Sequence, residues 1–218
     1  MENKLSQSLS ASYNPLVSII TPVLNGIKFL EPCLLSVLNQ SYPHIEHIFV
    51  DGGSTDGTLE MLNSYQAKYP HRIRFISEPD KGIAEAWNEG WRMASGEIFG
   101  ELGSDDMYEP DAIQTVVEFF RANSDAYFAF GECNHIDEKG NLIGRALTKD
   151  FDLDEAIDDV HHINCPSAFY RRQVIEKVGF MDASLPYAHD LDYWIRVGKL
   201  FTLYPIKKVL ASFRIHKD

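Results

Sequence analysis

Two adjacent carboxylates, Asp105 and Asp106, stand in the segment "ELGSDDMYEP", between an apolar strand-like run and a helix signal. Neighbouring like charges repel, so this placement needs a physical reason. One interpretation is a solvated turn, because Ser, Asp and Pro are common turn residues. The other is a site in which a divalent cation, held by carboxylate oxygens, meets the phosphates of a ligand.

Similar polar segments follow three other predicted strands: "TPVLNG", "VDGGSTDG" and "SEPDKG". Ligands of open parallel sheets collect at the carboxyl ends of the strands, so a carboxylate such as Asp51 can accept hydrogen bonds from a base or ribose. A tight turn with a helix cap at Ser54, Thr55 or Asp56 is the alternative interpretation. The GxGxxG fingerprint and the P-loop pattern are absent, which disfavours a nicotinamide cofactor or an ATPase.

The elements that position these segments alternate regularly in the first half of the chain. Strand-like runs at residues 16–23, 45–50, 72–77 and 97–102 are each followed by apolar residues at helical spacing. Four such pairs with short connections predict an α/β protein with a mainly parallel sheet covered on both faces. The helical spacing of Trp87 and Trp91, and likewise the position of Trp194, predict core packing rather than sugar stacking.

The pattern changes after about residue 125. Two extended runs within 126–146 flank the turn "DEKG" and predict a hairpin. We expect a strand at 163–170, a short helix at 171–179 ending at Gly179, and a helix at 189–200. The last segment, 201–218, is interpreted as a pair of strands.

Composition limits the possible partners. The chain has 218 residues, 44% of them hydrophobic, and a net charge of −12. This predicts one domain over residues 16–218, preceded by a flexible polar tail at residues 1–15. The negative charge disfavours binding to nucleic acid, because the phosphates would be repelled.

Cys33, Cys133 and Cys165 predict neither a disulfide framework nor a zinc site and suit a reducing cytoplasm. No apolar run approaches the roughly 20 residues that span a bilayer, so we expect a soluble cytoplasmic protein, with peripheral attachment to the inner face of a membrane left open.

The ordered segments "VSIITPVLNG", "VDGGSTDGT", "EPDKGIAEAWNEG", "ASGEI" and "GSDDMYEP" resemble the successive motifs of family 2 glycosyltransferases with the GT-A fold. The resemblance continues through "GECNHIDEKGNLIG", "FYRRQVIEKVGFMD" and "HDLDYWIRVGK", and so covers nearly everything after the tail. It implies a GT-A fold: a Rossmann-like, mainly parallel central sheet flanked by helices, with a mixed C-terminal region on the acceptor side. Residues 16–106 would bind the nucleotide sugar, and residues 107–218 the acceptor.

The resemblance also implies residue roles. Asp190 corresponds to the family's catalytic base, Asp106 and His216 to ligands of Mn²⁺ or Mg²⁺, and Asp105 with Asp106 to the DXD-like element. Asp192 is a less favoured base, and a first-turn helix acid is the other interpretation of Asp190. Residues that correspond to nucleotide-sugar contacts are Thr21, Pro22, Val23, Asn25, Asp51, Gly53, Ser54, Asp80, Lys81, Gly82, Asn88, Ser104 and Asp105.

Four positions depart from the family pattern. Glu101 stands where relatives usually have an apolar residue, and Gly103 where many have Asn. Cys165 stands where several have His, and His189 where the residue is often acidic.

The resulting hypothesis is an inverting, metal-dependent glycosyltransferase of surface polysaccharide or glycolipid synthesis. It would move a sugar from a nucleotide-diphosphate sugar, with uridine favoured, to a hydroxyl of a saccharide or lipid-linked acceptor. A nucleotidyltransferase is one alternative, although the segment "TPVLNGIKF" contains only one basic residue, Lys28, that could bind a triphosphate. A non-catalytic nucleotide-sugar-binding scaffold is another. The sequence leaves the donor sugar, the acceptor and the oligomeric state open.

Overall fold

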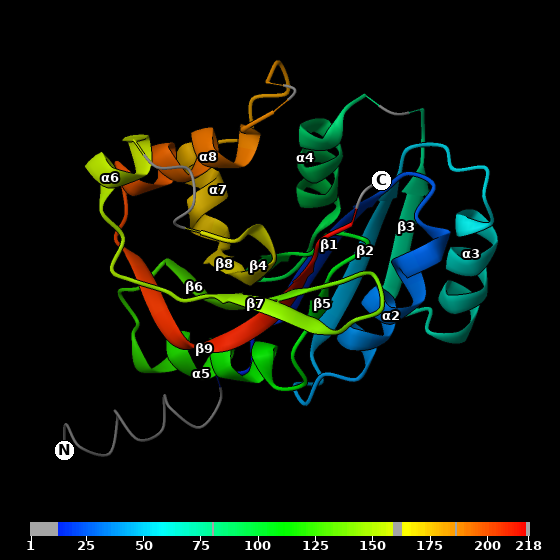
Figure 1. The fold of residues 1–218 in the computed structure, drawn as a ribbon, viewed down its shortest axis with the longest axis horizontal. Coiled ribbons are helices and arrows are strands. Elements are labelled where there is room, and N and C mark those ends of the chain that lie inside the picture. The colour runs from blue at the N-terminus through cyan, green and yellow to red at the C-terminus, as the bar shows by residue number, and fades with distance from the viewer. Residues whose placement is uncertain (1–12, 80, 159–162, 186, 217–218) are drawn as a thin grey trace.

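The computed structural model describes residues 13–79, 81–158, 163–185 and 187–216. Their strands form one nine-stranded sheet in the order β3-β2-β1-β4-β8-β6-β9-β5, with β7 paired to β6 at the side. Helices cover both faces, as the alternating pattern predicted (Figure 1). The α/β fold class predicted from the sequence is therefore confirmed.

The first half is a parallel sheet with helical crossovers. Its elements are β1 (Val17–Val23), α2 (Ile27–Leu38), β2 (Ile45–Asp51), α3 (Thr58–Lys68), β3 (Ile73–Ser77), α4 (Ile83–Met93) and β4 (Ile98–Glu101). β1 pairs in parallel with both β2 and β4, and β2 pairs in parallel with β3. Every residue of β1 and β2 is buried, because helices lie on both sides, and this explains their nearly continuous apolar runs.

The second half adds antiparallel strands to the far edge of β4. Its elements are β5 (Met107–Tyr108), α5 (Ala112–Ala122), β6 (Phe128–Ile136), β7 (Leu142–Ala146), α6 (Leu153–Asp158), the 3₁₀ turn η1 (Cys165–Ser167), β8 (Ala168–Arg171), α7 (Arg172–Val178), α8 (His189–Gly198) and β9 (Leu203–Arg214). β8 pairs antiparallel with β4 and β6, whereas β9 pairs parallel with β6 and antiparallel with β5. The mixed C-terminal region and the β6–β7 hairpin are confirmed.

Three expectations for this half need correction. The C-terminal segment is one long strand, β9, and not a pair: Lys207 and Lys208 resemble a turn but lie exposed in mid-strand, where register shifts bend the pairing with β6. The strand predicted from residue 163 starts only at Ala168, because Pro166 lies in the 3₁₀ turn before it and has no N–H for a ladder. The short elements β5 and α6 were not expected.

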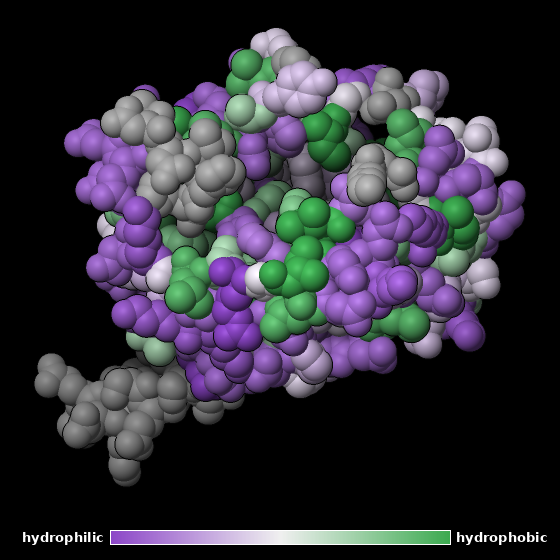
Figure 2. Space-filling model, viewed as in Figure 1, coloured by the Kyte–Doolittle hydropathy of each residue, from purple (hydrophilic) through white to green (hydrophobic). Residues whose placement is uncertain are grey.

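The core has a layer on each side of the sheet. Helices α4, α7 and α8 pack on one face, above the sheet in Figure 1, whereas α2, α3 and α5 pack on the other. Trp87, Trp91 and Trp194 are each at most 4% exposed and belong to the first layer, so their predicted core role is confirmed. The face shown in Figure 2 is largely hydrophilic, with scattered apolar patches, and the edge strand β7 exposes Leu142 and Ile143.

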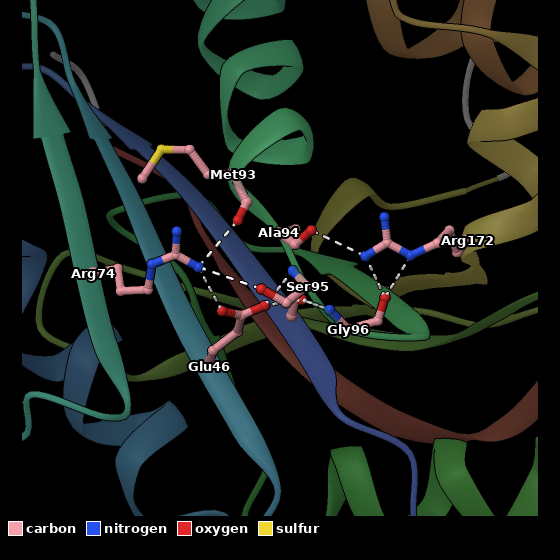
Figure 3. A network of polar contacts seen from close by, with 8 residues as sticks. Glu46, Arg74, Met93, Ala94, Ser95, Gly96 and Arg172 are labelled. Carbon is pink, nitrogen blue, oxygen red and sulfur yellow. Dashed lines mark hydrogen bonds and ion pairs between the residues drawn. The ribbon is translucent and has the colours of Figure 1, made fainter.

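A polar network fixes the loop between α4 and β4 (Figure 3). Buried Glu46 accepts hydrogen bonds through Oε1 from Ser18 Oγ at 2.6 Å and from Ser95 N at 2.6 Å. Arg74 Nη1 donates to its second oxygen at 3.0 Å. Arg172 binds two carbonyl oxygens of the same loop at 2.7 and 3.0 Å. The loop is thereby bonded to β1, β2, β3 and α7. These bonds fix where β4 begins, and so also the position of Glu101 at its end.

Residues 1–12 of the predicted tail lie outside the residues that the structure describes. The last three residues of the tail, 13–15, contact the domain. The hydroxyl of Tyr42 donates to Asn14 Oδ1 at 2.9 Å and to the carbonyl of Pro15 at 2.6 Å. The ring of Tyr13 lies 5.7 Å from the Arg171 guanidinium. Within the described part of the chain, no helix has the length and apolar character needed to cross a membrane.

Candidate active site

A pocket of about 290 Å³ opens at the carboxyl ends of β1, β2 and β3, beside the first turns of α4. Its wall includes six residues predicted to contact a ligand: Pro22, Val23, Asp51, Lys81, Gly82 and Ser104. They come from segments far apart in the sequence, which only the parallel sheet brings to one edge. Glu78, Glu85 and Glu89 also line the pocket, so Lys81 is its single cationic side chain among the described residues.

Asp51 presents one fixed and one unpartnered carboxylate oxygen. Its Oδ2 accepts hydrogen bonds from Gly53 N at 2.9 Å, Ser54 N at 3.0 Å and Ser77 Oγ at 2.6 Å. Its Oδ1 is buried and has no hydrogen-bond partner among the described residues. Gly53 has a φ of 89°, a conformation that glycine adopts at low cost and that brings its N–H back to the carboxylate. An unpaired buried acceptor is costly, so Oδ1 is well suited to a ligand N–H or O–H.

Asn25 and Ser54 do not line this pocket but lie in the loops that continue from its lining residues Leu24 and Gly52. The Asn25 N–H donates to Ser54 Oγ at 2.7 Å, and the Thr55 N–H donates to Asn25 Oδ1 at 2.9 Å. These bonds join the loops that follow β1 and β2. The predicted helix cap at Ser54, Thr55 or Asp56 needs correction: Gly57 is the cap residue and makes no side-chain capping bond, although the Thr58 N–H donates to Asp56 Oδ1 at 3.1 Å.

Two other predicted contact residues, Thr21 and Asn88, also lie outside the pocket wall. The hydroxyl of Thr21 is buried and bonded to His47 Nε2 at 2.9 Å. The amide of Asn88 is buried and pairs with both backbone groups of Met181, at 3.0 and 2.9 Å. Because these polar groups are already satisfied by the protein, the structure gives both residues a supporting role and not a place in the pocket wall. Asp80 lies outside the described residues.

The acidic pair of the opening segment is held by the end of β9. The backbone N–H of Arg214 donates to Asp106 Oδ1 at 2.8 Å, and its guanidinium donates to the carbonyl of Asp105 at 2.8 Å. His216 Nε2 lies 2.7 Å from Asp105 Oδ2. A Cβ on Gly103 would stand 2.8 Å from Asp106 Oδ2, so a larger residue there would displace the carboxylates. Arg214 is the arginine of the Arg-x-His element that contains His216, and the sequence assigned it no role of its own.

This acidic pair suits a hard divalent cation. Burial, together with the charge of Asp105, raises the pKa of Asp106 to about 8, so a cation would relieve a costly concentration of negative charge. Mg²⁺ and Mn²⁺ prefer oxygen ligands, and Mg²⁺ is commonly held by one or two carboxylates plus ligand phosphates. No group of three potential metal ligands occurs among the described residues. The described residues therefore do not form a complete cation site by themselves, and a ligand would have to complete the coordination of an ion held by the acidic pair.

A second acidic site begins helix α8. Asp190 lies in its first turn, half-buried, and its Oδ1 accepts from the N–H of Leu191 at 2.8 Å. Asp192 is engaged instead in an ion pair with Arg196 Nε at 2.8 Å. Ala188, immediately before the helix, has a φ of 57°, an unfavourable conformation for a residue with a Cβ. Of the two candidate bases, Asp190 is thus the one without an ion-pair partner among the described residues.

Glu101, at the end of β4, is a further buried carboxylate, and the sequence singled it out only as a departure from the family pattern. It is 0% exposed and accepts hydrogen bonds from the hydroxyl of Tyr170 and, at 3.1 Å, from Cys165 Sγ. Burial raises the pKa of Glu101 to about 7, and the charge of Asp190 contributes in the same direction. Both Asp190 and Asp106 act electrostatically on Cys165. Glu101 is thus held by two donors, Tyr170 of β8 and the partly buried Cys165 of the 3₁₀ turn before it.

The fold and the pocket define the chain as an α/β protein with a pocket at the carboxyl ends of parallel strands. The chain belongs to glycosyl transferase family 2, whose sequence profile matches residues 18–179. It is 33% identical over 207 residues to a chondroitin synthase of Escherichia coli, covering 94% of this chain and 29% of that protein. It is 31% identical over 208 residues to a putative teichuronic acid biosynthesis glycosyltransferase, TuaG, of Bacillus subtilis, covering 94% of this chain and 81% of that protein. The chain thus spans less than a third of the first of these relatives.

Solved structures confirm the GT-A fold. The chain superposes on S. aureus TarS in complex with UDP with a TM-score of 0.74 at 18% identity, covering 92% of this chain and 60% of that one. It superposes on the mannosyltransferase PcManGT from Pyrobaculum calidifontis, in complex with GDP-Man and Mn²⁺, with a TM-score of 0.72 at 19% identity, covering 93% of this chain and 57% of that one. At these identities the likeness concerns the fold.

Proposed function

We propose that this chain transfers a sugar from a nucleotide-diphosphate sugar to a hydroxyl group of a saccharide or lipid-linked acceptor, with inversion at the anomeric carbon. The observation that carries the proposal is Asp51, which lines a pocket at the carboxyl ends of the strands and has one buried oxygen without a hydrogen-bond partner among the described residues, in a member of a glycosyltransferase family. Relatives named for chondroitin and teichuronic acid synthesis support a saccharide product.

In this proposal the nucleoside lies in the pocket and gives an N–H of its base to Asp51 Oδ1. Uracil and guanine both carry a ring N–H that a carboxylate can accept, in keeping with the UDP, UDP-GlcNAc and GDP-Man present in the related structures. We place a uridine donor first because TarS is solved with UDP and UDP-GlcNAc. Ser104 and Lys81, on the wall of the same pocket, lie where they could contact the ribose and the phosphates.

The diphosphate would lie toward the acidic pair, with Mn²⁺ or Mg²⁺ bound by Asp106 and by Asp105 or His216. The cation would supply charge neutralisation for the departing diphosphate. Arg214 holds the Asp106 carboxylate through its backbone N–H and the backbone carbonyl of Asp105 through its guanidinium, so that the pair is in place before the ligand arrives.

Asp190 then serves as general base. The acceptor oxygen forms a bond to the anomeric carbon as the bond from that carbon to the diphosphate oxygen breaks, and the electron pair leaves with the diphosphate. The hydroxyl proton passes to the Asp190 carboxylate, for which an acid without an ion-pair partner is suited. Attack opposite to the departing diphosphate inverts the anomeric centre.

The proposal is tested by combining binding with turnover. Calorimetric titration with UDP-sugars and GDP-sugars, with and without Mn²⁺, should detect donor binding that Asp51→Ala weakens by about 1 to 3 kcal/mol, the worth of a buried acceptor that loses its partner. Incubation with a cognate donor should release the nucleoside diphosphate, slowly as donor hydrolysis or rapidly with an acceptor.

Two other outcomes would contradict transfer. Release of pyrophosphate from a nucleoside triphosphate and a sugar phosphate would show a nucleotidyltransferase, although Lys28, the cation near the end of β1, is engaged in an ion pair with Glu138. Donor binding with neither transfer nor hydrolysis would show a binding scaffold.

A further inference from the structure

Phe29 is a partly buried aromatic residue in the first turn of α2, and its ring belongs to none of the three apolar clusters formed by the described residues. Its neighbours are nitrogen groups instead. The guanidinium carbon of Arg214 and the Nζ of Lys28 each lie 4.7 Å from the ring centroid, and the ring of His216 lies 5.3 Å away. The negative face of an aromatic ring attracts such cations, so the placement of Phe29 indicates a role other than core packing.

The first of these contacts concerns the orientation of His216. Its Nε2 lies 2.7 Å from Asp105 Oδ2, whereas its Nδ1 is buried and has no hydrogen-bond partner in the part of the chain that the structure describes. A histidine of a metal site is usually oriented by a hydrogen bond from its second ring nitrogen. Here the ring of Phe29 packs against the imidazole at an interplanar angle of 38° and supplies a contact in place of that hydrogen bond.

The second contact concerns Arg214, whose guanidinium meets both Phe29 and the turn between β6 and β7. Its Nη1 donates to the carbonyls of Asp137 at 3.0 Å and Glu138 at 3.2 Å. Arg214 is 5% exposed, and a desolvated cation gains more from an aromatic ring than an exposed one does. Because the backbone N–H of the same residue donates to Asp106 Oδ1, the contacts that fix the guanidinium also fix this donor.

The helix that carries Phe29 is fixed at its start. The Ile27 N–H donates to Asp56 Oδ2 at 3.0 Å, and the Gly26 N–H donates to Thr58 Oγ1 at 3.1 Å. Both acceptors belong to the segment that follows β2, far from the C-terminal strand in the sequence. Phe29 therefore stands on a support that does not depend on β9.

We propose that Phe29 is a positioning residue for the acidic pair: its ring holds His216 against Asp105 and Arg214 against Asp106. The inference rests on the proposed function, in which a cation and the diphosphate bind at this pair. Each step is a direct contact, from the ring to His216 or Arg214 and from these to the pair. Carboxylates that are already in place need not be ordered when the ligand binds, and this preorganisation raises affinity. Phe29 is not among the residues that line the pocket for the nucleoside.

The test measures UDP binding by calorimetry with and without Mn²⁺. Phe29→Leu keeps an apolar side chain on α2 but removes the aromatic face. The gain in UDP affinity on adding Mn²⁺ should fall about fivefold, whereas the affinity without Mn²⁺ should stay within about twofold, because the pocket wall is unchanged. Phe29→Tyr retains the aromatic face and should retain the wild-type gain. Phe119→Leu is the matched control, because it removes a partly buried phenylalanine of α5 that packs on the core, and it should also retain the gain.

A second measurement follows His216 without cation or nucleotide. Nuclear magnetic relaxation of the ¹³C-labelled imidazole, identified by its loss in His216→Gln, gives the order parameter of this ring. The order parameter should fall in Phe29→Leu, because the packing contact is lost, and should keep its wild-type value in Phe29→Tyr and Phe119→Leu. Circular dichroism and Tm are measured for each protein to confirm the fold.

The outcomes separate the two proposals. If Phe29→Leu folds and keeps either the full Mn²⁺ gain or the wild-type order parameter of His216, this inference is wrong while the proposed function stands. An equal loss of UDP affinity with and without Mn²⁺ would also overturn it, because Phe29 would then support the whole pocket. If Phe29→Leu does not fold, Phe29→Met takes its place under the same criteria. If the wild-type protein binds UDP with no gain from Mn²⁺, the cation of the proposed function fails and the inference fails with it.

Discussion

The buried carboxyl group of Glu101 should make the stability of the domain depend on pH in a measurable way. Its pKa is raised from 4.5 to about 7 in the folded protein, chiefly by burial. Because the folded state holds this proton more tightly than the unfolded chain, the protonated group favours folding fully below the unfolded pKa, and this stabilisation is lost as the pH rises through the folded pKa. The side chain is fully buried, so solvent screening does not reduce the effect.

The magnitude follows from the two pKa values. Integrated between about pH 5 and about pH 8, the raised pKa of Glu101 removes ~2.5 kcal/mol from the free energy of unfolding of the wild-type protein. Glu101→Gln cannot ionise and does not undergo this loss. The difference in free energy of unfolding, Glu101→Gln minus wild type, should therefore increase by the same ~2.5 kcal/mol over this range. The increase does not depend on the value of that difference at low pH.

Urea unfolding followed by tryptophan fluorescence measures this difference, since Trp87, Trp91 and Trp194 are all buried. The m-values of the two proteins must agree, so that the comparison concerns stability alone. Glu97→Gln, which removes an exposed carboxylate, is the matched control and should show no such trend. A difference between wild type and Glu101→Gln that stays constant or shrinks with rising pH would refute the reasoning about burial.

Three further outcomes are expected. Asp190→Asn should abolish sugar transfer and leave the donor Kd from calorimetry within about twofold, because an amide cannot take the acceptor proton; an active variant would remove Asp190 from the reaction. Asp106→Asn should eliminate the gain in donor affinity on adding Mn²⁺, and an undiminished gain in the same titration would place the cation elsewhere. Gly103→Ala should weaken Mn²⁺-dependent donor binding by about tenfold, because its Cβ would stand 2.8 Å from Asp106 Oδ2; unchanged affinity would show that the acidic pair moves freely.

Much of the fold follows from short-range pattern. The four strand and helix pairs of the first half were predicted because a strand buried on both faces shows as a continuous apolar run, and helices between such strands repeat at helical spacing. Gly179 was predicted to end α7, and it follows the helix with a φ of 84°. By contrast, β9 was misinterpreted, because its exposed Lys207 and Lys208 are placed by pairing with β6, which a local pattern does not contain.

The sequence by itself determined which residue types could serve a site and that they end successive strands: Asp51, Ser104, Asp105 and Asp106. Only the tertiary structure decided what each does, because hydrogen-bond partners come from distant segments. It leaves one oxygen of Asp51 without a hydrogen-bond partner among the described residues. It bonds the side chains of Thr21 and Asn88 to other protein groups, and it places Arg214 of the last strand against Asp106. It also buries Glu101, and burial, which raises the pKa of this carboxyl group, is a property of the packed chain.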